Sequence, residues 1–260
     1  MKQAKMVLSA ALSEKTRPGR DDGLKARERL LGEAVRLFAE QGFARTSTRT
    51  IAQAAGVNIS AISYYFGDKE GLYRSAFYEP FAAYDAEGAI AALQAPDMPL
   101  HEALQTYFSY ILAPFGQGAQ MQQCLRLHMR EMLELTGLWQ KEIENRITPL
   151  HRALQALVTR HLGLACPDAG IQRLVFAIMG IPIYLILAQD LVQTLAPDLL
   201  HRADTIAAAV EAFTHYAQTL VEKEREMRQQ ACCGAAQEAQ AHHRSCRPQQ
   251  RSSGQSPASA

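Results

Sequence analysis

Apolar residues recur at intervals of three and four along most of this chain, and no stretch alternates with the period of two that marks a β-strand. The first such segment begins near Leu24 and stops at Gly42, because glycine readily ends a helix. Its inward face carries Leu30, Ala34, Leu37 and Phe38. The pattern predicts an all-α protein.

Two short helices follow. In residues 46–57, Thr46 or Ser47 can cap the helix through its hydroxyl, and Gly56 ends it. Asn58 can cap a second helix over residues 59–66. Asp68 is expected to cap a longer helix that continues past Phe77 towards Ile90.

The remainder reads as a series of longer helices. We expect them at residues 100–112, 119–135, 138–162 with a kink at Pro149, 168–194 and 198–228. The longest uncharged apolar run, residues 174–188, is shorter than the about 20 residues of a membrane span and contains Gly180 and Pro182. We therefore expect a buried helix or a subunit interface there.

These breaks divide the chain into four parts. Residues 1–22 form a flexible basic arm, residues 23–68 a three-helix unit, and residues 69–228 a larger helical bundle. Residues 229–260 lack core-forming side chains, so we expect a disordered tail.

Charge supports a separate polyanion-binding part. Residues 1–75 hold 13 Lys and Arg against 8 Asp and Glu, which gives +5, and the other residues hold 14 against 18, which gives −4 and accounts for the overall +1. The five cysteines form no regular disulfide framework, which favours a reducing cytoplasm.

Residues 46–66 meet the requirements of a helix-turn-helix. Ala52 is small where the helices cross, Gly56 makes the turn and Val57 locks the pair. Ser60, Ala61 and Ser63 are small enough for a DNA major groove about 12 Å wide. The adjacent tyrosines cannot share one helical face: Tyr64 can reach a phosphate, whereas Tyr65 either packs against the protein or joins the rim of the interface.

The run LFAEQGFARTSTRTIAQAAGVNISAISYYFGDKEGLY, residues 37–73, resembles the DNA-binding domain of the TetR/AcrR family of bacterial transcriptional regulators. The stretch LRLHMREML, residues 125–133, together with GDKEGLY, is similar to the subgroup of cefoperazone and chloramphenicol sensitivity regulators. The subgroup resemblance implies control of efflux or stress genes.

The family resemblance implies DNA contacts. Backbone contacts are expected from Thr46, Ser47 and Arg49, base contacts from Ile59, Ser60, Ala61 and Ser63, and phosphate contacts from Tyr64 and Lys69, with Tyr65 at the rim. Lys15, Arg17 and Arg20 of the arm can reach a minor groove. The second helix of the pair, residues 59–66, is the recognition helix and lacks Arg and Lys. Thymine-methyl contacts, bridging water and DNA shape should therefore determine its sequence specificity. Gly67 stands where the family often has a basic or polar residue.

The resemblance also implies an effector pocket and a dimer, and core packing is the alternative for each residue named. The pocket candidates are Tyr107, Phe108, Met121, His128, Met129, Met132 and Trp139. The dimer candidates are Leu174, Ile178, Ile181, Leu185, Val210, Phe213 and Ala217, from two helices that the family pairs across a twofold axis.

No catalytic or cofactor site is expected. The sequence contains no Gly-rich phosphate loop, HExxH or nucleophile elbow, and Cys232, Cys233, His242, His243 and Cys246 do not match a zinc spacing. We expect a cytoplasmic homodimer that represses from a palindromic operator and is released by a small molecule. The alternatives are an activator, or a helix-turn-helix that acts through protein contacts.

Overall fold

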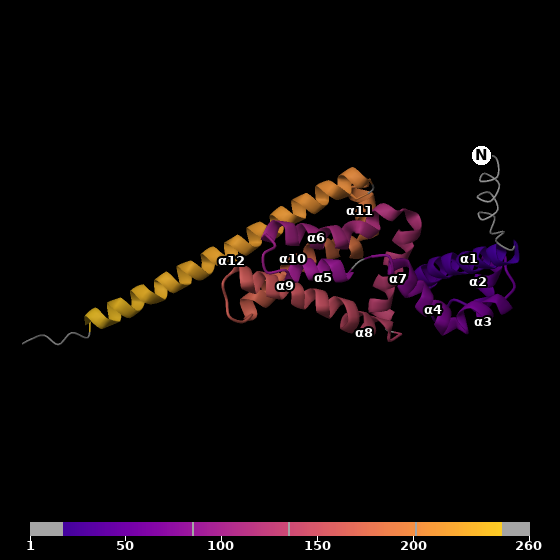
Figure 1. Ribbon diagram of the computed structural model, residues 1–260, viewed down its shortest axis with the longest axis horizontal. Helices are drawn as coiled ribbons and strands as arrows, with labels where there is room; N and C mark the ends of the chain where they lie inside the picture. Colours follow the sequence, from indigo (N-terminus) through magenta and orange to yellow (C-terminus); the bar gives the residue numbers. More distant parts are fainter. Residues whose placement is uncertain (1–17, 85, 135, 201, 246–260) are drawn as a thin grey trace, which may run out of the picture.

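The computed structural model describes residues 18–84, 86–134, 136–200 and 202–245, and every regular element within them is a helix. A small head of α1 to α4 lies at one end of the molecule (Figure 1). The helices of the body stack beside it, and α12 projects beyond the far end of the body. This confirms the all-α prediction and its division into a head and a bundle.

The head begins with α1 (Pro18–Gln41), followed by α2 (Thr48–Ala54) and α3 (Ser60–Phe66). Ser47 caps α2, because its side chain accepts a hydrogen bond from the Thr50 amide at 3.0 Å. Gly56 takes a φ of 64°, a conformation that disfavours other residues, and turns the chain between α2 and α3. The apolar faces then enclose one core around Leu30, Phe38, Ile51 and Ile62.

α4 (Lys69–Tyr78) leads from the head into the body. Its cap is Asp68, whose carboxylate accepts from the Gly71 amide at 2.6 Å. The predicted continuation towards Ile90 is wrong, since α4 ends at Tyr78 and gives way to a short 3₁₀ turn, Glu79–Phe81. Pro80 explains the break, because proline cannot donate to a continuing helix.

The body contains α5 (Ala86–Gln94), α6 (Leu100–Leu112), a 3₁₀ segment (Ala113–Gln117), α7 (Ala119–Glu134), α8 (Leu138–Glu142) and α9 (Thr148–His161). Instead of the single kinked helix predicted for residues 138–162, one π-helical turn, Ile143–Ile147, joins α8 to α9. Pro149 follows this turn and lacks the amide proton that a regular helix needs, so the ladder shifts there.

The last helices are α10 (Ala169–Leu187), α11 (Gln189–Leu195) and α12 (Ala203–Ser245). α12 continues well past Arg228, so the disordered tail predicted from residue 229 is wrong for residues 229–245. Ala and Gln make up nine of the 17 residues in that stretch, and both favour a helix. Cys246 and the rest of the expected tail lie outside the described residues.

α10 is long and apolar enough to cross a membrane by length and composition alone. Within the protein, it packs against α9 and α12. Leu174, Val175 and Ile178 are buried there. One side of α10 is therefore buried, while Phe176 and Tyr184 are exposed on it, so the prediction of a buried helix over residues 174–188 holds for one face only and a subunit interface remains the expectation for the other.

Candidate nucleic-acid interface and ligand cavity

The exposed face of the helix-turn-helix carries most of the predicted DNA contacts. Ser47 and Arg49 are exposed at the start of α2, and Ile59, Ser60 and Ser63 are exposed on α3. The Asn58 side chain accepts from both the amide and the hydroxyl of Ser60, which holds the start of α3. The helix thus presents short polar groups outward, as entry into a major groove requires.

Two predicted contacts lie elsewhere. The Thr46 side chain is only 1% exposed, and its hydroxyl donates to the carbonyls of Leu37 and Gly42. It therefore holds the end of α1 and cannot reach DNA. Ala61 is half-buried against the core of the head, so it lies at the edge of the predicted DNA-contacting face of α3.

The two tyrosines divide as the helix geometry demands. Tyr64 is 81% exposed, whereas Tyr65 is half-buried and packs against the head. A Cβ placed on Gly23 would lie 3.0 Å from the Tyr65 hydroxyl, so the ring rests on α1. Of the two alternatives, the structure favours packing for Tyr65, and its ring supports Tyr64 with a centroid distance of 4.8 Å.

Lys69 lies at the start of α4, directly after the recognition helix. Its ammonium sits 4.2 Å from the centre of the Phe43 ring. Gly71 lets α4 start this close, because a Cβ there would stand 1.9 Å from the Phe66 carbonyl oxygen. Arg20 belongs to the first turn of α1, and Lys15 and Arg17 lie outside the described residues.

Thr50 is a surface residue that the sequence analysis missed. It is exposed on α2, and its hydroxyl lies 2.7 Å from that of Ser47. The spacing of three from a capping serine is the signal that could have revealed it. The two hydroxyls together offer a polar patch beside Arg49.

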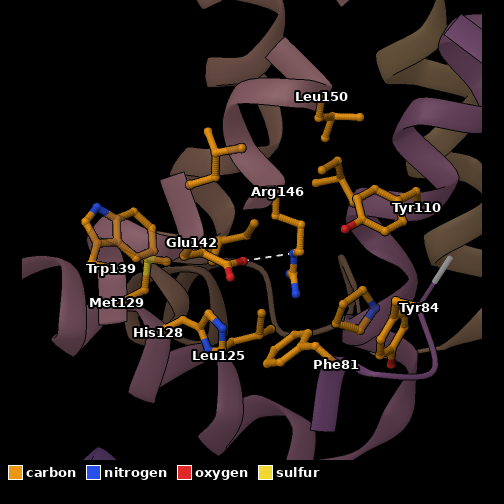
Figure 2. A pocket seen from close by; sticks show the side chains of 14 residues that line it. Phe81, Tyr84, Tyr110, Leu125, His128, Met129, Trp139, Glu142, Arg146 and Leu150 are labelled. Carbon is orange, nitrogen blue, oxygen red and sulfur yellow. Dashed lines mark ion pairs between the residues drawn. The ribbon is translucent and has the colours of Figure 1, made fainter. Parts of the chain in front are cut away.

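A cavity of about 140 Å³ lies in the body, lined in part by α7 and α8, and Figure 2 shows the side chains around it. Its lining comes from five α-helices, α6 to α10, and from the short segments between the helices. The residues are Phe81, Tyr84, Tyr110, Ile111, Pro114, Leu125, His128, Met129, Trp139, Glu142, Arg146, Ile147, Leu150 and Ile186.

Of the predicted pocket residues, His128, Met129 and Trp139 line this cavity. Tyr107 and Phe108 lie in the core instead, with Phe108 packed edge-on against Phe213. Met121 and Met132 are half-buried on α7 and do not line the cavity either. Glu142 and Arg146 also line the cavity and were not among the predicted residues. Their opposite charges at a spacing of four are the signal that could have identified them.

His128 is a buried polar group of the cavity wall. Its ring is 6% exposed, stacks on Phe77 at 3.8 Å and meets Phe81 at 4.4 Å. Burial lowers the pKa of His128 to about 3, although its hydrogen bond to the Cys124 carbonyl opposes that shift. The imidazole is therefore neutral at physiological pH.

Glu142 and Arg146 form an ion pair across one helical turn, with Nε and Oε1 2.9 Å apart (Figure 2). Burial raises the pKa of Glu142, and Arg146 opposes that rise. The Arg146 guanidinium also lies 5.4 Å from the centre of the Phe81 ring. The pair places one charge of each sign beside an apolar cavity.

Several side-chain contacts join this body to the head. Tyr73 of α4 donates to the buried Glu131 carboxylate of α7 at 2.7 Å, and Phe77 of α4 stacks on His128. Glu131 also accepts from the Trp139 amide at 3.3 Å. Arg130 donates to the carbonyls of Ala39 and Glu40 at the end of α1. The cavity wall is thus bonded directly to the elements that carry the helix-turn-helix.

The predicted dimer residues mostly face inward. Leu174, Ile178, Val210 and Ala217 are buried within this chain, and Ile181, Leu185 and Phe213 are half-buried against its core. The neighbouring stripes of α10 and α12 are apolar and exposed instead. Their members are Phe176, Ile183, Tyr184 and Leu187 on α10, with Tyr216 and Leu220 on α12.

Together, an exposed helix-turn-helix and a ligand-sized cavity in a helical body define a DNA-binding transcriptional regulator. Residues 30–76 match the family described as "Bacterial regulatory proteins, tetR family", and residues 100–222 match the "HTH-type transcriptional dual regulator CecR, C-terminal domain". The chain belongs to the TetR family and to its CecR-like subgroup. Both resemblances predicted from the sequence are confirmed.

Individual relatives agree. The chain is 29% identical to the HTH-type transcriptional dual regulator CecR of Shigella flexneri, over 61% of this chain and 74% of that protein. It is 42% identical to the probable HTH-type transcriptional regulator YttP of Bacillus subtilis, over 23% of this chain and 30% of that protein. A TetR-like transcriptional regulator from Rhodococcus sp. RHA1 shares the fold with a TM-score of 0.50 and 16% identity, over 75% of this chain and 96% of that one.

Proposed function

We propose that this regulator binds a palindromic operator as a homodimer and is released when a small molecule fills the cavity between α7 and α8. The observation that supports release most strongly is the direct bonding between cavity and head. Phe77 and Tyr73 of α4 contact His128 and Glu131 on consecutive turns of α7. A ligand that shifts α7 or α8 would move α4 with it and change the position of the head.

In the operator complex, α3 enters the major groove. Ile59, Ser60 and Ser63 face base edges, while Tyr64 and Lys69 approach phosphates on either side. Ile59 is 49% exposed at the start of α3, which suits contact with a thymine methyl group. Ser47, Thr50 and Arg49 add backbone contacts from the start of α2.

The exposed apolar stripe on α10 and α12 supports a dimer. Phe176 is 64% exposed and Tyr184 58% exposed, two turns apart on α10, and several large exposed apolar side chains on neighbouring helices suit contact with a partner. A twofold dimer would pair the stripe with its own copy and present two α3 helices to half-sites about 34 Å apart. We assign the interface to this stripe rather than to Leu174 and Ile178.

We further propose that the protein is a cytoplasmic regulator without catalytic activity and acts mainly as a repressor. Activation is the second candidate, because the Shigella flexneri relative is named a dual regulator. Placing the selected operator upstream of, and then overlapping, a reporter promoter separates these two roles. Repression from both positions would rule out the dual role.

The experiment that tests DNA binding is selection of genomic fragments with the purified protein, followed by sequencing. We expect a palindromic motif to be enriched, which would support a dimer reading two half-sites. Folded protein that enriches no sequence at low salt would contradict operator binding. A helix-turn-helix acting through protein contacts would then be the better account.

A further inference from the structure

The polar groups of the cavity between α7 and α8 restrict the chemistry of its ligand. The wall is aromatic and aliphatic except for His128, the Glu142–Arg146 pair and the hydroxyls of Tyr84 and Tyr110. Figure 2 shows the Glu142–Arg146 pair near the centre of the view and His128 below it. A buried polar group on such a wall needs a matching group on the ligand.

His128 is a hydrogen-bond acceptor on this wall. Its Nδ1 lies 3.1 Å from the Cys124 carbonyl oxygen, and since a carbonyl only accepts, Nδ1 carries the hydrogen and donates it. Nε2 of a neutral ring then bears a lone pair. Within the described part of the chain this atom is buried and has no hydrogen-bond partner. It is therefore free to accept one hydrogen bond from a ligand.

The ion pair argues against a charged ligand. Glu142 is 4% exposed, and its carboxylate is already bonded to Arg146. An anion would have to take Arg146 and leave Glu142 buried without its partner, which is unfavourable. A cation would stand beside the Arg146 guanidinium. A neutral molecule disturbs neither charge.

The aromatic lining favours a flat ring. Phe81, Tyr84 and Trp139 surround the space beside His128, and aromatic rings stack well on such walls. We propose that the cavity binds an uncharged aromatic molecule that donates one hydrogen bond, from a phenolic hydroxyl or a ring N–H, to Nε2 of His128. This inference rests on the proposed function, because it names the class of effector for the same cavity.

Trp139 offers a direct readout, since it is the one tryptophan in the sequence and lines the cavity. We would titrate the full chain, without DNA, with para-ethylphenol and indole as donors. Para-ethylanisole, para-ethylbenzoate and para-ethylbenzylamine would serve as the donor-free, anionic and cationic probes. Changes in Trp139 fluorescence report binding of the benzene-ring probes, and calorimetry gives the dissociation constant of indole, which fluoresces as tryptophan does.

We expect both donors to bind and the methyl ether to bind about tenfold more weakly than the phenol, the factor that one neutral hydrogen bond contributes. The benzoate and the benzylamine should bind more weakly still. Equal affinity for the phenol and its ether, a preference for either ion, or no binding by either donor would overturn the proposal. Binding by one donor alone would retain it and identify the hydroxyl or ring N–H class. This series needs no variant and so does not depend on how a substitution folds.

Substitutions then locate the acceptor. His128→Phe keeps a ring against Phe77. It should lower the affinity for the phenol about tenfold, to that of the ether, and leave the affinity for the ether unchanged. His128→Gln restores an acceptor and should recover part of the affinity. His151→Phe is the matched control, because His151 contacts Met179 and Phe176 rather than the cavity. Unchanged phenol binding by His128→Phe would refute the assignment.

The outcome remains separable from that of the proposed function. Donor-dependent binding that leaves operator affinity unchanged would contradict effector release and keep the ligand class. An effector that releases the operator but carries no hydrogen-bond donor, or carries a charge, would contradict the ligand class and support effector release.

Discussion

The hydroxyl of Tyr73 in α4 donates a hydrogen bond to the Glu131 carboxylate in α7 across 2.7 Å, and both side chains are buried. The same carboxylate accepts from the amides of Leu138 and Trp139 and from Thr136, so it holds the start of α8 as well. Burial and Glu131 raise the pKa of Tyr73, which keeps its hydroxyl protonated as a donor. One carboxylate thus ties the helix below the head to the wall of the cavity.

Removing that hydroxyl should weaken the joint without abolishing the fold. Tyr73→Phe should lower the free energy of unfolding by about 1–2 kcal/mol, because Glu131 loses one donor and keeps the others. It should also reduce the factor by which an effector weakens operator binding. Denaturant unfolding and paired DNA titrations measure the two effects. Tyr64→Phe, on an exposed ring, is the control expected to leave stability unchanged; a Tyr73→Phe protein with normal stability would contradict this account.

Lys69 should contribute to DNA affinity rather than to sequence preference. Lys69→Ala should weaken binding to all sequences about equally and reduce the slope of log affinity against log salt by about one unit, because one phosphate contact is lost. Ser60→Ala or Ser63→Ala should change the preferred sequence instead. Lys141→Ala, exposed on α8, controls for the change in net charge. An unaltered salt slope for Lys69→Ala would speak against the proposed docking.

The dimer assignment predicts opposite effects for two neighbouring stripes of α10. Tyr184→Asp should give a folded monomer with poor operator affinity, since it puts a charge on the exposed stripe. Ile178→Ala should keep the dimer and cost about 2–4 kcal/mol in unfolding free energy, because Ile178 is buried within the chain. Analytical ultracentrifugation and thermal unfolding distinguish the two. A dimeric Tyr184→Asp protein would require another interface.

His128 should contribute to acid sensitivity. Its pKa falls from an ordinary 6.5 to about 3 in the folded protein, so the unfolded chain binds the proton more readily between these values. The free energy of unfolding should therefore fall as pH drops from about 6.5 towards 3. His128→Gln should show a smaller fall than the unsubstituted protein in the same titration. Parallel curves would show that the ring is not held in its neutral form.

The sequence predicted elements best where local signals agreed. Residues 100–112 form a helix with the predicted bounds, because Pro99 precedes it and Pro114 follows it. Pro80 was overlooked as the end of α4. α12 was cut short because helix propensity can extend a helix beyond its last core residue.

The site was harder to predict. The exposed positions of α3 follow from the helical spacing of its apolar residues. The sequence does not show which of the two adjacent apolar stripes of α10 packs against α9 and α12 and which one remains exposed. Likewise, Phe81 and Arg146 lie far apart in sequence, and only the folded chain brings them to one cavity. Thr46 looked like a cap and is instead a buried hydroxyl under α1.

The central claim is that cavity and operator are thermodynamically coupled. The direct test is to measure the affinity of an effector through Trp139 fluorescence, with and without saturating operator DNA, and the affinity of the operator with and without saturating effector. We predict that each weakens the other by the same factor, as linkage requires. Effector affinity that stays the same on the operator would contradict the account.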